Sequence, residues 1–273
     1  MEKFSVLISV YIKEDPVFFT DALASIFNQT LPPTELLIVK DGPLTEELDN
    51  IILNFIHEYP SKIRVFPLEE NGGLGKALRI GVENCKYNII ARMDTDDICV
   101  SDRFEKQIGY LSNNPSAVLV GSFVEEFNKV PGDLKVIKEV PEIHDQIIKY
   151  SKQRNPFNHP SVAFRKSAII NVGSYKTMIY FEDYYLWLRL LNNLNGYIVY
   201  NIQDPLLYFR IGNDMIGRRH GINYLVKEIN FLNLAFKESL ITFYEFCRLI
   251  VTRVPLRILP KPLLKLFYKI LLR

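Results

Sequence analysis

Cysteine is scarce in this chain of 273 residues, and its three cysteines share no metal-ligand spacing. An odd number (Cys85, Cys99 and Cys247) argues against a disulfide framework and indicates a reducing compartment. No apolar run reaches the length of about eighteen residues that a membrane-spanning helix needs. A secretory leader is not expected, because the first residues lack a basic segment and a small-residue cleavage site. These absences together predict a cytoplasmic location.

Acidic side chains are absent beyond Glu245, although the formal net charge of the whole chain is only +2. Residues 246–273 carry seven basic side chains, whereas residues 1–245 carry 26 basic and 31 acidic ones. The near-neutral total gives no case for nucleic-acid binding, and none is expected. The basic, leucine-rich tail suits an anionic lipid surface. We therefore expect residues 246–273 to attach the protein peripherally to the inner face of the cell membrane; the alternative is a helix packed on the body with its basic groups in water.

The composition is that of a globular protein with a sizeable core, since 48% of the residues are apolar and 23% are charged. Strand and helix patterns alternate through the first half of the chain, where Asp15 and Thr45 are expected to cap two of the helices. Strands separated by helices predict an α/β fold, in which helices cover both faces of a mostly parallel sheet. The expected strands are residues 5–11, 35–40, 63–68, 87–93, 117–124, 161–165 and 197–211, and the other expected helices are 75–85, 102–111, 144–152 and 183–191.

Polar residues follow the first four expected strands. Tyr11 ends the first strand, Asp41 follows the second, residues 71–73 form a glycine-rich turn after the third, and Asp94-Thr95-Asp96-Asp97 follows the fourth. Turn formation alone would explain any one of them. Three carboxylates within four residues, however, repel each other unless a cation lies among them. Because ligands bind at the carboxyl ends of parallel strands, Asp94 and Asp96 are candidates to hold Mg²⁺ or Mn²⁺ with a nucleotide diphosphate.

The glycine-rich segment matches neither common nucleotide-binding motif. A P-loop would need glycine at Glu70 and Ser or Thr at Ala77, and a dinucleotide fingerprint would need glycine at Leu78. Lys76 remains a candidate for contacting phosphate.

A second acidic cluster begins an aromatic helix in the second half of the chain. Glu182 and Asp183 precede Tyr184, Tyr185 and Trp187, the only tryptophan. Acidic residues are favoured at any helix N-terminus, which is the structural alternative. In the functional interpretation Asp183 is a general base, Glu182 orients it or the acceptor, and the aromatic rings stack on a sugar. On the same acceptor side we place His159, Trp187 and Arg189, although a structural loop histidine is an equal alternative for His159.

Taken together, these residues resemble the family 2 glycosyltransferases of GT-A fold, in particular bacterial enzymes of surface-polysaccharide assembly. The resemblance covers about residues 4–215. It rests on ordered motifs, namely FSVLISVY at 4–11, ASIFNQT at 24–30, LIVKDG at 37–42, NGGLGKAL at 71–78, RMDTDD at 92–97, RNPFNH at 154–159 and EDYYLWLR at 182–189.

The resemblance implies roles for individual residues. Tyr11 would lie against the uracil of a UDP-sugar, Asp41 would bond its ring, and Asp94 would approach the ribose or the metal. Asp96 would hold the metal at the diphosphate, and Asp183 would be the base of an inverting transfer. Two departures qualify the match. Lys40 stands where many relatives carry an acidic residue, and the Gln-x-x-Arg-Trp signature of processive synthases is absent, which favours single additions.

The expected organisation is a GT-A catalytic domain over residues 1–215 and a helical C-terminal extension over 216–273. Within the domain, residues 1–125 would bind the nucleotide and 126–215 the acceptor. The expected partners are a UDP-sugar donor and a lipid-linked saccharide acceptor. A nucleotidyltransferase acting on a sugar phosphate, or a non-catalytic polysaccharide-assembly protein, is the alternative.

Overall fold

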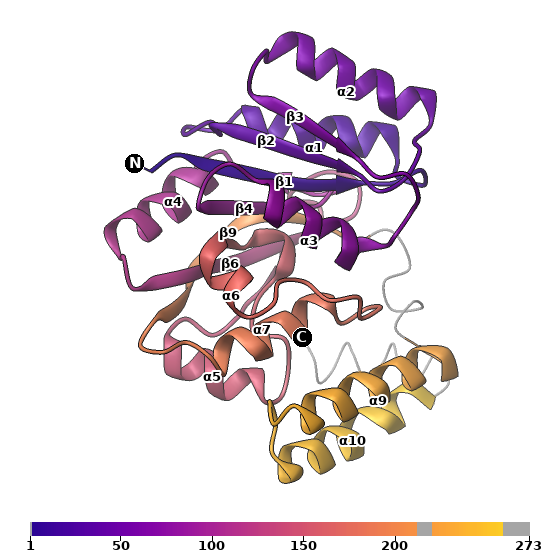
Figure 1. Ribbon diagram of the computed structural model, residues 1–273, viewed down its shortest axis with the longest axis vertical. Coiled ribbons are helices and arrows are strands. Elements are labelled where there is room, and N and C mark those ends of the chain that lie inside the picture. The colour runs from indigo at the N-terminus through magenta and orange to yellow at the C-terminus, as the bar shows by residue number, and fades with distance from the viewer. Residues whose placement is uncertain (1, 212–219, 259–273) are drawn as a thin grey trace.

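A nine-stranded sheet forms the centre of the computed structural model, which describes residues 2–211 and 220–258 (Figure 1). The strands follow the order β3-β2-β1-β4-β8-β6-β9-β5, and β7 pairs with β6. The first four strands pair only in parallel with one another, as the alternating pattern predicts. They are β1 (Phe4–Val10), β2 (Glu35–Lys40), β3 (Ile63–Pro67) and β4 (Ile89–Met93).

The second half of the sheet is mixed. β8 runs antiparallel to both β4 and β6, whereas β6 and β9 are parallel. Residue 125 falls inside β6, so the sheet continues across the expected division between the two halves of the catalytic domain. The strands of this half are β5 (Ile98–Cys99), β6 (Ala117–Phe127), β7 (Val136–Lys138), β8 (Ala163–Arg165) and β9 (Ile198–Arg210).

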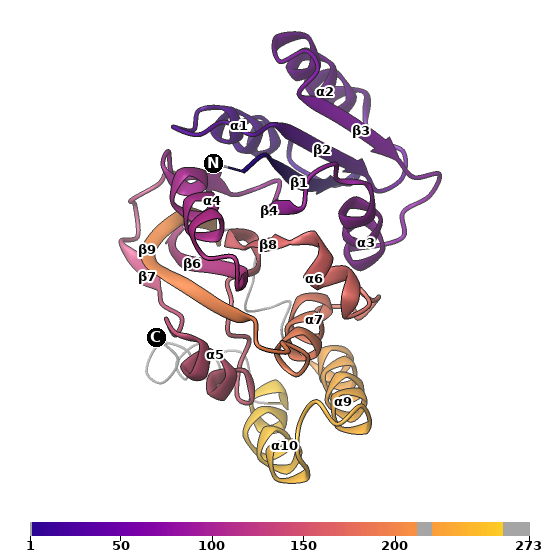
Figure 2. The ribbon, with the colours of Figure 1, turned by 60° about the vertical axis from the view of Figure 1, so that its left-hand side comes forward.

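Helices cover both faces of the sheet, which confirms the predicted layers (Figure 2). One face buries its apolar side chains against α1 (Pro16–Phe27), α2 (Glu46–Glu58) and α4 (Arg103–Asn113). The other packs against α3 (Leu74–Asn84), α5 (His144–Ser151), α6 (Lys166–Asn171) and α7 (Glu182–Leu191).

The first two helices begin where capping residues predict. The Asp15 carboxylate accepts the backbone N–H groups of Val17 at 2.9 Å and Phe18 at 3.2 Å, and Pro16 occupies the first helical position. The Thr45 hydroxyl accepts the N–H of Leu48 at 3.3 Å. Both helices therefore start directly after a strand end and leave these ends open for function.

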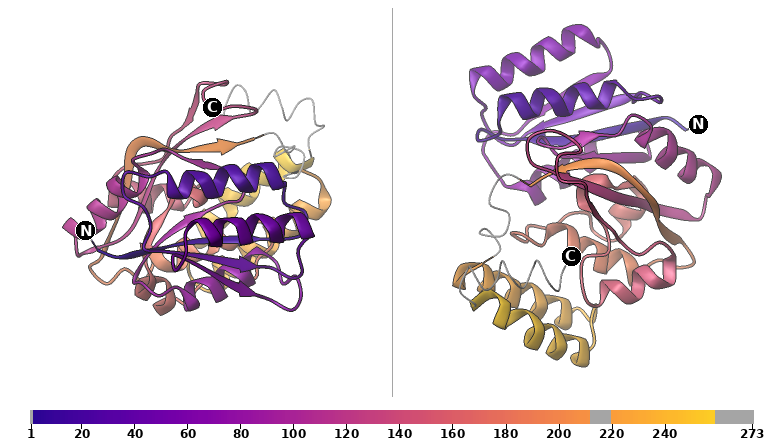
Figure 3. Two further views of the ribbon diagram at one scale, coloured as in Figure 1. Left: turned by 90° about the horizontal axis from the view of Figure 1, so that it is seen from above. Right: turned by 180° about the vertical axis from the view of Figure 1, so that it is seen from behind.

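The C-terminal helices form a hairpin on the outside of α7 (Figures 1 and 3). α9 (Ile222–Lys237) and α10 (Phe243–Ile258) share an apolar cluster with α7, in which the ring of Phe231 stacks on that of Phe181 at 4.8 Å. Pro255 lies within α10, and the helix continues past it to Ile258. The expected helical extension beyond residue 258 lies outside the described residues.

Three basic residues of the expected membrane tail face the protein instead. Glu228, with a side chain only 1% exposed, pairs with Arg253 at 2.9 Å and with Arg257 at 2.7 Å. Arg248 donates to the backbone oxygen of Lys152 at 3.1 Å. The expectation of seven basic groups free to meet lipid is therefore wrong for these three. The other four (Lys261, Lys265, Lys269 and Arg273) lie outside the described residues.

No helix within residues 2–211 and 220–258 is both long enough and apolar enough to span a bilayer.

Candidate active site

The ends of β1 and β2 and the turn after β3 meet at one edge of the sheet. Asp41, 5% exposed, donates its backbone N–H to the oxygen of Val10 at 2.8 Å. Its carboxylate accepts the N–H groups of Gly72 at 2.7 Å and Gly73 at 3.0 Å. The acidic group after β2 thus holds the glycine-rich turn after β3. Tyr11, 38% exposed, lies at the neighbouring strand end. The predicted convergence is observed, whereas the uracil contacts of Tyr11 and Asp41 stay predictions.

Lys76 lies in the first turn of α3. Its ammonium group is 3.7 Å from the carboxylate of Glu70, and its side chain is 37% exposed. It remains available to a ligand at this edge, and its contact with phosphate stays a prediction.

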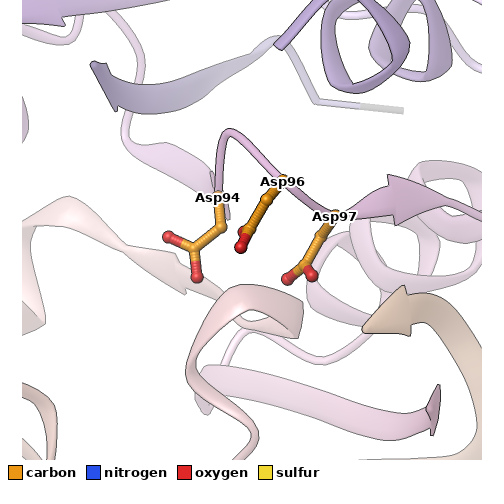
Figure 4. Close-up of side chains that lie close together, drawn as sticks. All are labelled: Asp94, Asp96 and Asp97. Carbon is orange, nitrogen blue, oxygen red and sulfur yellow. The ribbon is translucent and has the colours of Figure 1, made fainter. Parts of the chain in front are cut away.

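The acidic triplet forms a compact cluster between β4 and β5 (Figure 4). Carboxylate oxygens of Asp94, Asp96 and Asp97 lie within 4.8 Å of one another. The two-residue strand β5, too short to be recognised in the sequence, follows directly and pairs with β9. This pairing fixes the turn that carries the three carboxylates.

The triplet fits a hard divalent cation. Asp97 accepts the backbone N–H of Arg210 through Oδ1 at 2.9 Å, while its buried Oδ2 has no hydrogen-bond partner. Burial and the charge of Asp94 raise the pKa of Asp96 to about 6, and the same causes raise the pKa of Asp97 well above its usual range. A cation would reverse this cost by favouring the charged carboxylates. Oxygen-only donors suit Mg²⁺ or Mn²⁺, and Asp97 joins the predicted Asp94 and Asp96 as a candidate ligand.

Two buried arginines form polar contacts with residues of the triplet. Arg92, 2% exposed, pairs with Asp94, and Nε and Nη1 of the same guanidinium have no hydrogen-bond partner. The Nε of Arg210 donates to the backbone oxygen of Asp96 at 2.9 Å, and its guanidinium lies 3.7 Å from the ring centroid of Phe18. Sequence reasoning missed Arg92, although an arginine inside the apolar strand IIARM is a signal that could have revealed it.

Glu14 is a fourth carboxyl group near the triplet that the sequence did not single out. It shares a hydrogen bond with the side chain of Thr95. Burial, opposed by that bond and reinforced by the charges of Asp94 and Asp96, raises its pKa to about 7. The loop after β1 therefore adds to the acidic character of the site.

The second acidic pair begins α7, as expected. Oδ2 of Asp183 accepts the side-chain amide of Asn155 at 2.5 Å, which fixes the carboxylate. Burial raises the pKa of Glu182 to about 7, and its carboxylate accepts the backbone N–H of Tyr180. A Cβ atom added at Gly75 would lie 3.0 Å from Cγ of Glu182, so α7 begins directly against the start of α3. The second acidic pair therefore lies beside the first turn of α3, which follows the glycine-rich turn.

Comparison with known proteins identifies the family. The family described as "Glycosyl transferase family 2" matches residues 5–178. The chain belongs to this family. It is 40% identical to the UDP-Gal:alpha-D-GlcNAc-diphosphoundecaprenol beta-1,3-galactosyltransferase of Escherichia coli, over 99% of this chain and 97% of that protein. It is also 40% identical to the amylovoran biosynthesis glycosyltransferase of Erwinia amylovora, over 97% and 98%.

Solved structures agree on the fold. The mannosyltransferase of Pyrobaculum calidifontis, determined with GDP-mannose and Mn²⁺, superposes with a TM-score of 0.61 at 15% identity, covering 99% of this chain and 81% of that one. The protein is a glycosyltransferase of GT-A fold, and this conclusion replaces the nucleotidyltransferase and assembly-protein alternatives.

His159 of the glycosyltransferase lies beside Tyr175 and near Arg92, the arginine that pairs with Asp94. Its Nε2 lies 2.9 Å from the hydroxyl of Tyr175, a buried residue. Burial and the nearby charge of Arg92 lower the pKa of His159 well below its usual range. A neutral, half-buried imidazole beside Arg92 fits the structural alternative better than a cationic contact to acceptor phosphate.

Two expected acceptor contacts of the glycosyltransferase are wrong. Trp187 is 0% exposed and packs edge-on against Phe157 at 5.6 Å between ring centroids, so it cannot stack on a sugar. Arg189 is 5% exposed and donates to the backbone oxygens of Val172 and Ser174. Every residue of α7 from Tyr184 to Leu191 is buried, so both side chains are enclosed although they lie on different sides of the helix. Arg189 holds the segment that leads to α7 through these two bonds.

Proposed function

We propose that this glycosyltransferase moves a single hexose, with inversion, from a UDP-sugar to a lipid-linked saccharide in the assembly of a bacterial surface polysaccharide. Full-length identity of 40% to the E. coli galactosyltransferase carries this proposal, because that protein's name gives both a UDP-sugar donor and a diphosphoundecaprenol-linked acceptor. The equally similar Erwinia amylovora protein is named for amylovoran biosynthesis. The first substrates to test are therefore UDP-galactose as the donor and, as the acceptor, a lipid that carries GlcNAc through a diphosphate.

The geometry supports a division of labour between the two acidic clusters. Asp94, Asp96 and Asp97 would hold Mg²⁺ or Mn²⁺, and a bound cation stabilises the negative charge that grows on a departing diphosphate. Tyr11, Asp41 and Lys76 would contact the nucleotide at the same sheet edge. This arrangement leaves the start of α7 to the acceptor.

Asp183 would act as the general base in this proposal. The amide of Asn155 holds its Oδ2 in place. In an inverting transfer the carboxylate takes the proton of the acceptor hydroxyl while that oxygen attacks the sugar from the face opposite the leaving group. Glu182 would orient this region through the backbone N–H of Tyr180.

Transfer is tested with the full-length protein, Mn²⁺ and a synthetic short-chain lipid that carries GlcNAc diphosphate. UDP-galactose, UDP-glucose and their N-acetyl forms are supplied in turn, and product mass and UDP release are measured. We expect one donor to add one sugar, and the Asp183→Asn variant to add none. No product and no UDP release with any of the four donors would contradict the proposal.

We further propose peripheral attachment to the inner face of an anionic membrane, now through α10 as well as the residues beyond it. The outward side of α10 carries three strongly exposed apolar side chains, Phe243 (66%), Tyr244 (73%) and Val251 (71%). An exposed aromatic and aliphatic helix face suits the boundary between lipid headgroups and acyl chains. Four basic residues of the sequence follow this helix and are complementary to anionic headgroups.

Co-sedimentation with anionic vesicles tests the attachment without removing α10, whose arginines pair with Glu228. Phe243→Ser with Val251→Ser is compared with Leu53→Ser, a matched change on α2 at a residue that is 60% exposed. We expect the α10 double variant to lose most vesicle binding, and the control to bind like the parent in a salt-sensitive manner. Equal sedimentation of all three proteins would exclude α10 as the attachment surface.

A further inference from the structure

Tyr180 combines an unusual backbone with an exposed aromatic side chain, two residues before Glu182. Its φ angle is +74°, in the left-handed region that bulky residues rarely adopt, and its side chain is 50% exposed. Residues held in such conformations cluster at binding and active sites, where surrounding contacts maintain them. The contacts around Tyr180 therefore decide whether its position is fixed.

The backbone of Tyr180 is fixed from both sides. Its N–H is bound by the carboxylate of Glu182, and the next residue, Phe181, donates its N–H to Met178 at 2.7 Å. The ring of Phe181 is buried against Phe231 of α9. Tyr180, with its strained backbone, thus lies within a hydrogen-bonded turn and next to the buried ring of Phe181.

The side chain of Tyr180 is also partly held while it stays exposed. Its ring lies 5.2 Å from that of Tyr224, and the ammonium of Lys227 lies 5.0 Å from its centroid. Both partners come from α9. An aromatic ring that is placed in advance and half open to solvent loses little freedom when a ligand covers it.

The location matches the acceptor side of the site. Asp183, the proposed base, follows three residues later, and Glu182 lies against the start of α3, which follows the glycine-rich turn. Trp187, the ring that the sequence suggested for sugar stacking, is buried in the core. Tyr180 is the exposed aromatic side chain next to the base along the chain.

We propose that the ring of Tyr180 is the stacking platform for the pyranose ring of the acceptor saccharide. This inference rests on the proposed function of the site. The apolar C–H face of a pyranose packs on an aromatic ring, a contact that needs the ring and not its hydroxyl. Tyr180 thereby sets the angle at which the acceptor hydroxyl approaches Asp183, and Glu182 is the residue that positions Tyr180.

Three variants separate the ring from the backbone. Tyr180→Gly removes the ring but keeps a residue that adopts positive φ without strain, and Tyr180→Phe keeps the ring. Tyr197→Gly is the matched control, since Tyr197 is also 50% exposed but precedes β9 at the opposite edge of the sheet. The assays are transfer from UDP-galactose to the short-chain GlcNAc-diphosphate lipid, UDP release without acceptor, and calorimetric UDP binding.

We expect Tyr180→Gly to raise the KM for the acceptor by about two- to tenfold, the effect of losing one aromatic contact. The KM for the donor, UDP affinity and acceptor-free UDP release should match the parent, and Tyr180→Phe and Tyr197→Gly should behave like the parent throughout. An acceptor KM within twofold of the parent, or an equal loss of UDP affinity, would overturn the inference.

Direct binding keeps the two proposals distinguishable. Saturation-transfer NMR with the GlcNAc-diphosphate lipid, in the presence of UDP, reports contact even if the parent transfers no sugar. Loss of signal in Tyr180→Gly and retention in Tyr180→Phe would support the platform when the proposed transfer fails. A parent protein that shows no saccharide signal would overturn it.

Discussion

Glu228 is the single acidic partner of two arginines in the described part of the α9–α10 hairpin, and replacing it by glutamine tests how strongly this hairpin is attached. Removing one member of a buried ion pair typically costs about 3–5 kcal/mol, because the other charge is left uncompensated. Arg257, 9% exposed, would lose this ion pair and keep the contact of its guanidinium with the ring of Tyr224, 4.7 Å from the ring centroid. Arg253 is 16% exposed and keeps its bond to the backbone of Gln153. The loss in free energy of unfolding should therefore be about 3 kcal/mol. In a protein of this size that corresponds to a fall in Tm of about 6–12 °C.

Urea unfolding measures this loss. It is followed by circular dichroism for helix content and by the fluorescence of Trp187, the only tryptophan, a core residue of α7. Glu83→Gln, at an exposed position of α3, is the control and should change little. If the hairpin opens independently, the helix signal of Glu228→Gln should fall before that of Trp187. A loss below about 1 kcal/mol would refute the reasoning, because a solvent-exposed ion pair typically contributes up to that amount and the Glu228 pair would then act like an exposed one.

Acidification provides a second arm of the same experiment. Burial opposes the ionisation of Glu228, but the bonds to Arg257 and Arg253 outweigh it and lower its pKa. A lowered pKa in the folded state means that the stabilisation is present above the ordinary value of 4.5 and is lost as the pH falls through the lowered value. The difference between parent and Glu228→Gln should therefore shrink on acidification; a difference that grows would contradict the ion-pair account.

Four further substitutions test the site itself. Asp96→Asn and Asp97→Asn should each abolish the enhancement of UDP binding by Mn²⁺ in calorimetry, whereas Asp204→Asn, at an exposed position, should retain it; enhancement that persists in Asp97→Asn would remove that residue from the ligand set. Asp183→Asn should keep its UDP affinity and lose about 10²–10⁴-fold in kcat, and a variant with more than about a tenth of the parental kcat would exclude Asp183 as the base. Because the pKa of Glu182 is raised to about 7, its contribution to stability is full below its ordinary value of 4.5 and is lost as the pH rises through 7. The Tm of Glu182→Gln should accordingly fall less than the parental Tm between pH 5 and 8, and parallel curves would show that Glu182 is not held in this state.

Much of the first half of the fold could be predicted, because its signals are local. Asp15 and Thr45 cap their helices through bonds to residues two or three positions away, and the apolar run 35–40 is β2 to the residue. The direction of β8 could not be predicted, because it depends on which strands lie beside it. β5 consists of two residues and exists only through its pairing with β9.

The site was predicted where the chemistry is contiguous in the sequence and missed where it is assembled in space. Asp94, Asp96 and Asp183 stand in acidic clusters whose chemistry is visible in the sequence. Arg92 and Asn155 also stand in motifs, but only the structure shows that Arg92 pairs with Asp94 and that Asn155 donates to Asp183. Trp187 was misplaced because composition shows that a helix is aromatic but not that it is buried on every side, as α7 is from Tyr184 to Leu191.

Gly75 changes how the glycine-rich turn should be understood. A Cβ atom at this position would lie 2.9 Å from the backbone oxygen of Lys176, an atom that cannot move aside as a flexible side chain could. This glycine is therefore required by the close packing of α3 against the segment around Lys176 and the start of α7. An alanine here would push the segment that carries Tyr180 away from α3 and misalign donor and acceptor sides without touching either substrate. Motif searches that count glycines as phosphate contacts would overlook a glycine that is needed for close packing between the donor and acceptor sides of a catalytic site.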